Sequence, residues 1–92
     1  MQVVWSFQAR QQLDDIVMFI AEDNPTAALL VDDLLRDAAD GLRSFPQKGR
    51  IGRVAGTREF VVHSNYILVY ACDEDNVDIL SVLHTSRQYP PD

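Results

Sequence analysis

The sequence predicts a two-layer α+β domain in which a helical hairpin packs on one face of a mainly antiparallel sheet. Between residues 6 and 42, apolar residues recur at spacings of three and four, which is typical of amphipathic helices. After residue 58 the pattern changes to alternating or continuous apolar runs separated by short polar turns, which is typical of strands. A length of 92 residues fits one such domain, spanning residues 1–92.

The first half of the chain contains signals for one strand and two helices. Residues 2–5 are short, apolar and β-prone, and Ser6 follows as the N-cap of a first helix. The apolar residues of that helix are Ala9, Leu13, Ile16, Val17 and Ile20. Asn24 and Pro25 suit the cap and the first position of a second helix. Its apolar residues are Ala27, Val31, Leu34, Leu35, Ala38 and Leu42. The short break between the helices predicts an antiparallel hairpin.

A loop and three strands make up the second half, which gives the order β-α-α-β-β-β. Gly41 and Pro46 bracket the end of the second helix, and we expect Phe45 between them to pack on the core. In the loop that follows, positive-φ turns are expected at Gly49, Gly52 and Gly56. The predicted strands of the meander are 59–63, 66–72 and 77–84.

Charge is unevenly distributed in this chain of net charge -6. Residues 1–42 carry two basic and eight acidic residues, residues 43–70 carry five and one, and residues 71–92 carry one and five. Half of the eight Lys and Arg residues fall between Lys48 and Arg58. This concentration predicts a local basic surface for a polyanion or an acidic partner, while the acidic remainder disfavours non-specific binding to duplex nucleic acid.

Several function classes find no support in the sequence. Cys72 is the single cysteine, so the chain cannot form an internal disulfide, and we expect this side chain to be buried as a small apolar group. Residues 73–76 lack the ligand spacing of a calcium loop and are interpreted as a solvated turn. No metal and no cofactor is predicted, because neither a metal-ligand cluster nor a glycine-rich phosphate loop is present. Without a signal peptide or a membrane-length apolar run, the sequence predicts a cytoplasmic protein.

The order and spacing of several short segments form one pattern across essentially all 92 residues. The segments are Trp5-Ser6 with Ala9 and Leu13, Ile20 to Ala28, Pro46 with Gly49 to Val54, Gly56 to Glu59, Tyr66 to Tyr70, and Ile79 to His84 with Arg87 and Pro90. This pattern resembles toxins of the RelE/ParE superfamily of bacterial type II toxin-antitoxin systems, also called plasmid-stabilisation proteins. The resemblance implies the same fold and a hetero-oligomeric complex with a cognate antitoxin.

Two activities occur in this superfamily, and one position helps to separate them. The RelE-like branch cleaves mRNA on the ribosome, whereas the ParE-like branch poisons DNA gyrase. RelE-like nucleases commonly place an arginine directly after the aromatic residue or histidine that opens the central strand, and Ile67 stands there in this chain. An aliphatic side chain cannot stabilise a charged phosphorane. We therefore favour the ParE-like branch, with a ribosome-dependent endoribonuclease as the alternative.

The candidate site residues differ between these two activities. A gyrase-binding toxin is expected to use Arg50, Arg53, Arg58 and Arg87. A nuclease would rely on Arg58, His84, Arg87 and Tyr89. Structural roles are the alternatives: an ion pair of Arg58 with Asp33 or Asp37, solvated positions for Arg50 and Arg53, a hydrogen-bonded strand end for His84, and an exposed or docking role for Tyr89.

The antitoxin is expected to wrap the helical hairpin and the sheet edge, either as a helix in an apolar groove or by strand addition. The groove residues are predicted to come from Ile16, Ile20, Leu30, Leu34 and Leu35. Leu34 is also expected to contribute to the core at the seam of the hairpin.

Overall fold

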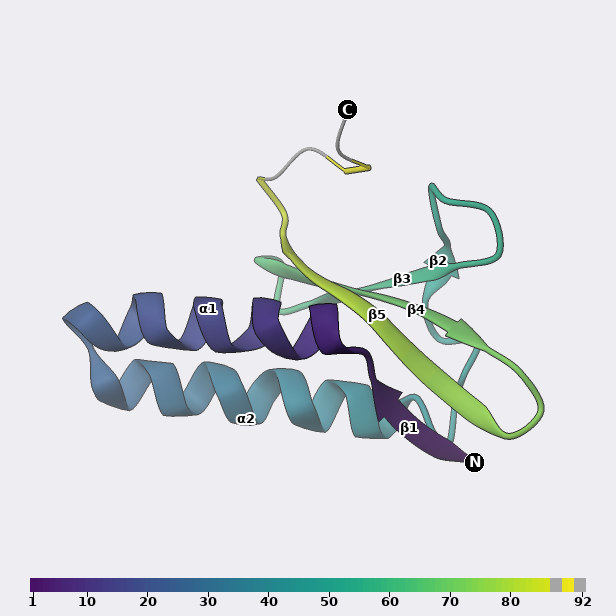
Figure 1. Cartoon of the computed structure of the whole chain (residues 1–92), viewed down its shortest axis with the longest axis horizontal. Helices are drawn as coiled ribbons and strands as arrows, with labels where there is room; N and C mark the ends of the chain where they lie inside the picture. Colours follow the sequence, from purple (N-terminus) through teal and green to yellow (C-terminus); the bar gives the residue numbers. More distant parts are fainter. Residues whose placement is uncertain (87–88, 91–92) are drawn as a thin grey trace.

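The computed structural model describes residues 1–86 and 89–90 and shows two helices packed on a five-stranded sheet (Figure 1). The elements are β1 (Gln2–Trp5), α1 (Phe7–Asp23), α2 (Pro25–Gly41), β2 (Arg50–Ile51), β3 (Arg58–Val62), β4 (Tyr66–Cys72) and β5 (Asn76–His84). The strand order is β1-β5-β4-β3-β2, and β1 runs parallel to β5 while the other pairs are antiparallel. The predicted α+β fold is confirmed.

Local sequence signals set the helix boundaries. The Ser6 hydroxyl accepts a hydrogen bond from the Ala9 amide at 3.0 Å, which caps α1. The Asn24 side chain accepts a bond from the Ala27 amide at 3.0 Å, which caps α2, with Pro25 at its first turn. Because one residue separates the helices, they form the predicted antiparallel hairpin, and its tip projects beyond the strands (Figure 1).

The main core lies between the hairpin and one face of the sheet. Its buried members are Ala9, Leu13, Leu35, Ala39, Leu42, Val62, Leu68, Tyr70, Val77, Ile79 and Val82. Two predictions for α2 are wrong here. Leu35 is 0% exposed and cannot line a groove, whereas Leu34, expected in the core, is 36% exposed. The two residues lie about 100° apart around the helix, so only one of them can face the sheet.

A second, smaller cluster lies on the opposite face of the sheet, which we call the open face because α1 and α2 both pack on the other one. Ile67, Val69 and Leu83 are buried there, and Tyr89 packs against them. Side chains alternate along a strand, so β3 sends Glu59 and Val61 to this face and Phe60 to the helices. The open face is therefore partly apolar, and Glu59 lies on it beside the apolar cluster.

The loop between α2 and β3 differs from the sequence interpretation. It contains the additional short strand β2, in which Arg50 pairs with Glu59 of β3. A positive φ occurs at Gly56, at +81°, but not at Gly49 or Gly52. Gly49 is needed for close approach instead, because a Cβ there would lie 2.7 Å from the Tyr70 hydroxyl oxygen. At Gly52 a Cβ would collide with Thr57.

Two side chains expected to be buried are exposed. Phe45 lies on the surface of the loop after α2, and Cys72 lies at the exposed end of β4. Partial desolvation raises the pKa of the Cys72 thiol, which keeps it protonated at neutral pH and makes it a poor nucleophile.

A separate question is whether a helix could span a bilayer. Among the described residues, α1 and α2 both lack the length and apolar content that this requires.

Candidate functional site

The basic segment of the sequence divides across the two faces of the sheet. Arg50 and Arg53 meet Glu59 on the open face. Arg58 pairs in register with Tyr70, whose side chain lies in the core beneath the helices, so Arg58 belongs to the helix-facing side. Lys48 also lies on that side, with its Nζ atom 4.9 Å from the centre of the Phe60 ring. The four neighbouring cations therefore do not form one surface.

Glu59 is the centre of the open-face site. Its carboxylate accepts bonds from Arg50 Nη2 at 3.1 Å and from Arg53 Nη2 at 3.0 Å. Arg53 Nε lies 3.2 and 3.1 Å from the two carboxylate oxygens, and the Arg53 backbone amide donates at 2.8 Å. We call Arg50, Arg53, Glu59 and Tyr89 the Glu59 cluster. The two arginines, for which a merely solvated role was considered, are bound to Glu59. Arg58, for which an ion pair with Asp33 or Asp37 was considered, donates instead to the Gly49 carbonyl among the described residues.

The electrostatics of the Glu59 cluster follow from these bonds. The Glu59 side chain is 0% exposed, and burial alone would raise its pKa. The hydrogen bonds from Arg53, followed by those from Arg50, outweigh burial and lower the pKa of Glu59 from 4.5 to about 2. The same contact raises the pKa of Arg53. At neutral pH the cluster holds two cations and one buried anion, so its net charge is positive.

Tyr89 joins the cluster to the apolar part of the open face. Its ring packs against Ile67, Val69 and Leu83, and the central guanidinium carbon of Arg53 lies 5.3 Å from the ring centre. The ring face attracts the cation because the quadrupole of an aromatic ring is negative there. This contact fits the docking role considered for Tyr89, with its own sheet as the surface on which it docks.

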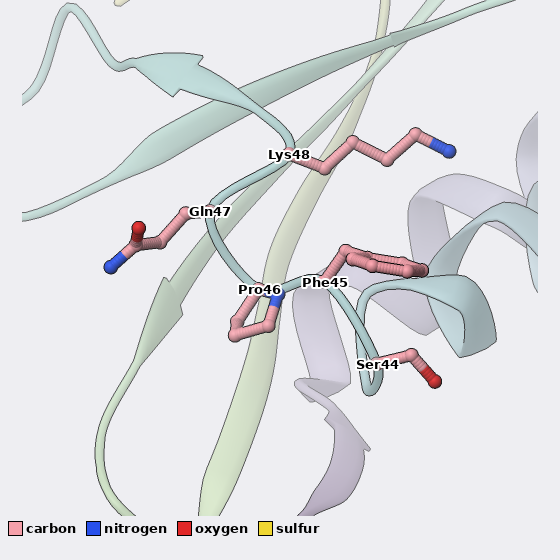
Figure 2. Close-up of a pocket in the computed structure, with 5 residues that line it drawn as sticks. All are labelled: Ser44, Phe45, Pro46, Gln47 and Lys48. Atoms are coloured by element: carbon pink, nitrogen blue, oxygen red, sulfur yellow. The ribbon is translucent and has the colours of Figure 1, made fainter.

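On the other side of the sheet, the loop after α2 is tied to the core by Tyr70. Its hydroxyl donates to the Pro46 carbonyl at 2.8 Å and accepts from the Gly49 amide at 2.9 Å. Arg58 Nη1 donates to the Gly49 carbonyl at 2.8 Å. A shallow surface depression follows this loop from Ser44 to Lys48, and Figure 2 shows the Phe45 and Lys48 side chains on the same side of the chain. Hydrogen bonds from Arg58 and Tyr70 therefore hold the loop against the helix-facing side of the sheet.

A second candidate site lies where the overhanging hairpin meets the end of the sheet. We call this cleft of about 460 Å³ the helix-end cleft, and it is lined by Asp15, Ile16, Phe19, Ile20, Tyr66 and His84. The ring of His84 meets Tyr66 edge to face at 5.5 Å. Its Nδ1 accepts a bond from the Ser86 amide at 3.1 Å, so a neutral ring carries its proton on Nε2. The cleft is mainly apolar and contains one histidine and one carboxylate.

The residues predicted for a nuclease do not converge. Arg58 pairs with Tyr70 and His84 pairs with Tyr66, so four residues of β4 separate them along the sheet. At about 3.3 Å per residue this is roughly 13 Å. Tyr89 lies on the opposite face from His84. Arg87, predicted for both activities, lies outside the described residues.

Sequence reasoning did not identify the central residue of the site. Glu59 is the single acidic residue between positions 43 and 70, and it follows directly after the basic segment. A lone carboxylate in a strand beside four cations could have indicated a shared ion pair. The missing information was β2, which brings Arg50 opposite Glu59.

Comparison with known proteins agrees with this fold. The family model for the ParE toxin of the type II toxin-antitoxin system, parDE, matches residues 3–89. Putative toxin Y4kP of Sinorhizobium fredii is 38% identical over 90 residues, which cover 97% of this chain and 93% of the relative. Toxin RelE2 of Caulobacter vibrioides is 35% identical over 86 residues, which cover 94% and 97% of the two chains.

Two solved structures have a similar fold at low sequence identity. A chain of the chromosomal ParDE TA system from P. aeruginosa has a TM-score of 0.84 and 19% identity, with 91% of this chain and 95% of that chain covered. The solution structure of the conserved hypothetical protein HP0894 from Helicobacter pylori has a TM-score of 0.59 and 17% identity, with 95% and 97% covered. At these identities the likeness concerns the fold alone.

Proposed function

The chain belongs to the ParE toxin family of type II toxin-antitoxin systems, and from this premise we propose that it stops growth by binding DNA gyrase rather than by cutting RNA. The proposal is supported by the separation of the nuclease candidates. Arg58 and His84 lie roughly 13 Å apart along the sheet. A phosphate group is too small to be contacted by both, yet phosphoryl transfer needs its acid, base and cation around one phosphate.

The open face adds to the same argument. Ile67 occupies the position at which a RelE-like nuclease would place a cation, and its side chain is buried under Tyr89. We propose that the exposed sides of Arg50 and Arg53 contact the target, with Arg58 supporting their loop from the other face. Arg87 stays in the proposed target-binding set on the basis of its sequence position.

The purified toxin should therefore inhibit gyrase supercoiling and leave ribosome-bound mRNA intact. In the same assay, Arg50→Ala should weaken inhibition, because an exposed contact to a charged partner is lost. Arg36→Ala is the matched control: its side chain is 54% exposed against 59% for Arg50, and it also forms an ion pair with one carboxylate. Ribosome-dependent cleavage by the wild type, without gyrase inhibition, would establish the nuclease alternative instead.

We further propose that the cognate antitoxin binds the helical hairpin. Ile16 and Ile20 line the helix-end cleft, and Leu30 and Leu34 are exposed at i, i+4 spacing on α2. Such a stripe fits an amphipathic helix laid into a groove. Eight acidic residues in residues 1–42 favour a basic antitoxin segment.

Co-expression with a neighbouring antitoxin frame should give one complex in size-exclusion chromatography. Leu30→Ser should weaken the complex, because it removes an apolar side chain from the proposed contact surface. Leu30 is exposed, so its replacement leaves the core intact. Leu29→Ser is a matched control, since Leu29 is equally exposed but lies about 100° away around α2. Equal weakening by both variants would place the antitoxin elsewhere on the hairpin.

A further inference from the structure

The Glu59 cluster combines a fully buried acceptor with two partly solvated cations. The Glu59 side chain is 0% exposed, whereas Arg50 and Arg53 are 59% and 45% exposed. A surface ion pair usually contributes little, because two long side chains must be ordered in water. Here Glu59 is already fixed in β3, so only the arginine side chains lose conformational entropy when the ion pairs form. The arrangement therefore orients the cations as well as neutralising a buried charge.

Each arginine retains donors after binding Glu59. Glu59 uses Nη2 of Arg50, and Nε and Nη2 of Arg53. Across residues 1–86 and 89–90, Nε and Nη1 of Arg50 and Nη1 of Arg53 make no hydrogen bond with the protein. A guanidinium edge with two N–H groups matches the geometry of a carboxylate. The pair can thus hold the buried carboxylate and still bind a second one from outside.

The loop that carries these arginines is ordered by its own hydrogen bonds. The Gly52 amide donates to the Thr57 carbonyl at 2.8 Å, and the Thr57 hydroxyl donates to the Val54 carbonyl at 2.7 Å. The Arg53 amide, between these bonds, donates to Glu59. Backbone and side chain of Arg53 are therefore fixed before any partner arrives, which lowers the entropic cost of binding.

An apolar side chain next to Arg53 indicates the kind of partner. Val54 is partly exposed there, whereas the highly exposed Ile51 pairs with Arg58 and belongs to the helix-facing side. A sugar–phosphate backbone gains little from aliphatic contacts, whereas a protein surface can match cation and aliphatic group together. The net charge of -6 also disfavours nucleic acid. The surface fits a protein patch in which a carboxylate lies beside an apolar residue.

We propose that Glu59 is a positioning residue, which holds Arg50 and Arg53 as a preorganised pair for a carboxylate on the surface of the target protein. This inference rests on the proposed function, since gyrase is the target in question. Glu59 itself does not contact the target. Its removal should therefore affect target binding through the arginines and leave the hairpin, where the antitoxin is proposed to bind, unchanged.

The test uses Glu59→Gln with Glu74→Gln as the matched control. Both substitutions remove one carboxylate, but Glu74 lies in the exposed turn between β4 and β5. In proton–nitrogen NMR spectra, the Arg53 Nε–H signal should lose its hydrogen-bonded shift and its protection from exchange in Glu59→Gln only. The concentration for half-inhibition of gyrase should rise about tenfold or more in that variant, while antitoxin affinity stays within about twofold.

Arg53→Lys provides a second variant that keeps the charge and the buried carboxylate. A lysine cannot bind Glu59 through a two-pronged fork, so inhibition should again weaken about tenfold. Gyrase inhibition at wild-type strength by either variant, with the Arg53 signal changed or absent, would overturn the positioning role. A proportional loss of antitoxin affinity would also overturn it, because it would indicate a general folding defect. Failure of the wild type to inhibit gyrase would overturn the proposed function and this inference together.

Discussion

Two neighbouring leucines of α2 provide a direct test of how the helical hairpin meets the sheet. Leu35 is 0% exposed in the core, and Leu34 is 36% exposed on the adjacent face. Leu→Ala removes three carbon atoms beyond Cβ in both cases. At about 0.8 kcal/mol per buried methylene, the transfer term at Leu35 is about 2.4 kcal/mol. The cavity left among packed neighbours raises the cost to about 3 to 4 kcal/mol.

The cost at Leu34 is smaller for three reasons. About two-thirds of the side chain is buried, which reduces the transfer term to about 1.6 kcal/mol. Its open side leaves no closed cavity, so the cavity term is absent. Alanine is also the better helix former by a few tenths of a kcal/mol. We therefore expect Leu34→Ala to cost about 1 kcal/mol.

Urea unfolding followed by circular dichroism would measure both values from the change in midpoint at constant slope. A domain of this size has a free energy of unfolding of about 5 to 10 kcal/mol, so the two variants should be clearly resolved. Equal midpoints for Leu34→Ala and Leu35→Ala, or a larger loss at Leu34, would show that α2 is rotated relative to the packing described above.

Three further predictions concern the sheet and the loop that packs on it. The pKa of Glu59 is about 2 in the folded chain against its ordinary value of 4.5. The stabilisation by the ionised carboxylate is therefore complete above pH 4.5 and is lost as the pH falls toward 2. Solvent around the exposed arginines reduces this stabilisation to about 1–2 kcal/mol, and Glu59→Gln should make the free energy of unfolding less dependent on pH in this interval. Gly49→Ala should cost about 2 kcal/mol or more in urea unfolding, because the new Cβ would lie 2.7 Å from the Tyr70 hydroxyl. Gly41→Ala is the control and should be neutral or stabilising, because a Cβ at Gly41 would meet no atom within 4 Å. Tyr70→Phe should cost about 1–3 kcal/mol in thermal unfolding, since it leaves the Gly49 amide without its partner and removes one hydrogen bond to the Pro46 carbonyl; an unchanged midpoint would mean that water replaces the hydroxyl.

Sequence patterns predicted the elements whose causes are local. Ser6, Asn24 and Pro25 act on the residues next to them, so cap and helix boundary can be read from a few positions. The strands after residue 58 were recognisable for the same reason, because turn residues and alternation mark them. Their predicted bounds differ from the observed ones by one residue at the ends.

The wrong predictions depend on contacts between distant segments. The helical periodicity of α2 allowed either Leu34 or Leu35 to face the core, and the position of the sheet decides between them. Cys72 was expected to be buried because cysteine usually is, but it lies at the end of β4, where the helices no longer cover the sheet. Burial at an element's end depends on its neighbours rather than on residue type.

The candidate site illustrates the same limit. Four cations close in sequence suggested one basic surface, but strand alternation sends Arg58 to the helix-facing side and leaves Arg50 and Arg53 with Glu59. The two-residue strand β2 sets this register, and a strand so short has almost no sequence signature. The sequence therefore identified the basic segment, while the division of its charges required the structure.

The single carboxylate that follows the basic segment explains how two arginines can lie together on the open face. Two guanidinium groups at close range repel each other, and a domain of 92 residues has little stability to spare. Glu59 lies between them and accepts bonds from both, so each cation is attracted to the same buried charge. Because the net charge of the cluster remains positive, the domain keeps a cationic surface despite its acidic composition. Salt should consequently weaken target binding more than it weakens the fold, since the outward contacts are exposed and the Glu59 carboxylate is buried.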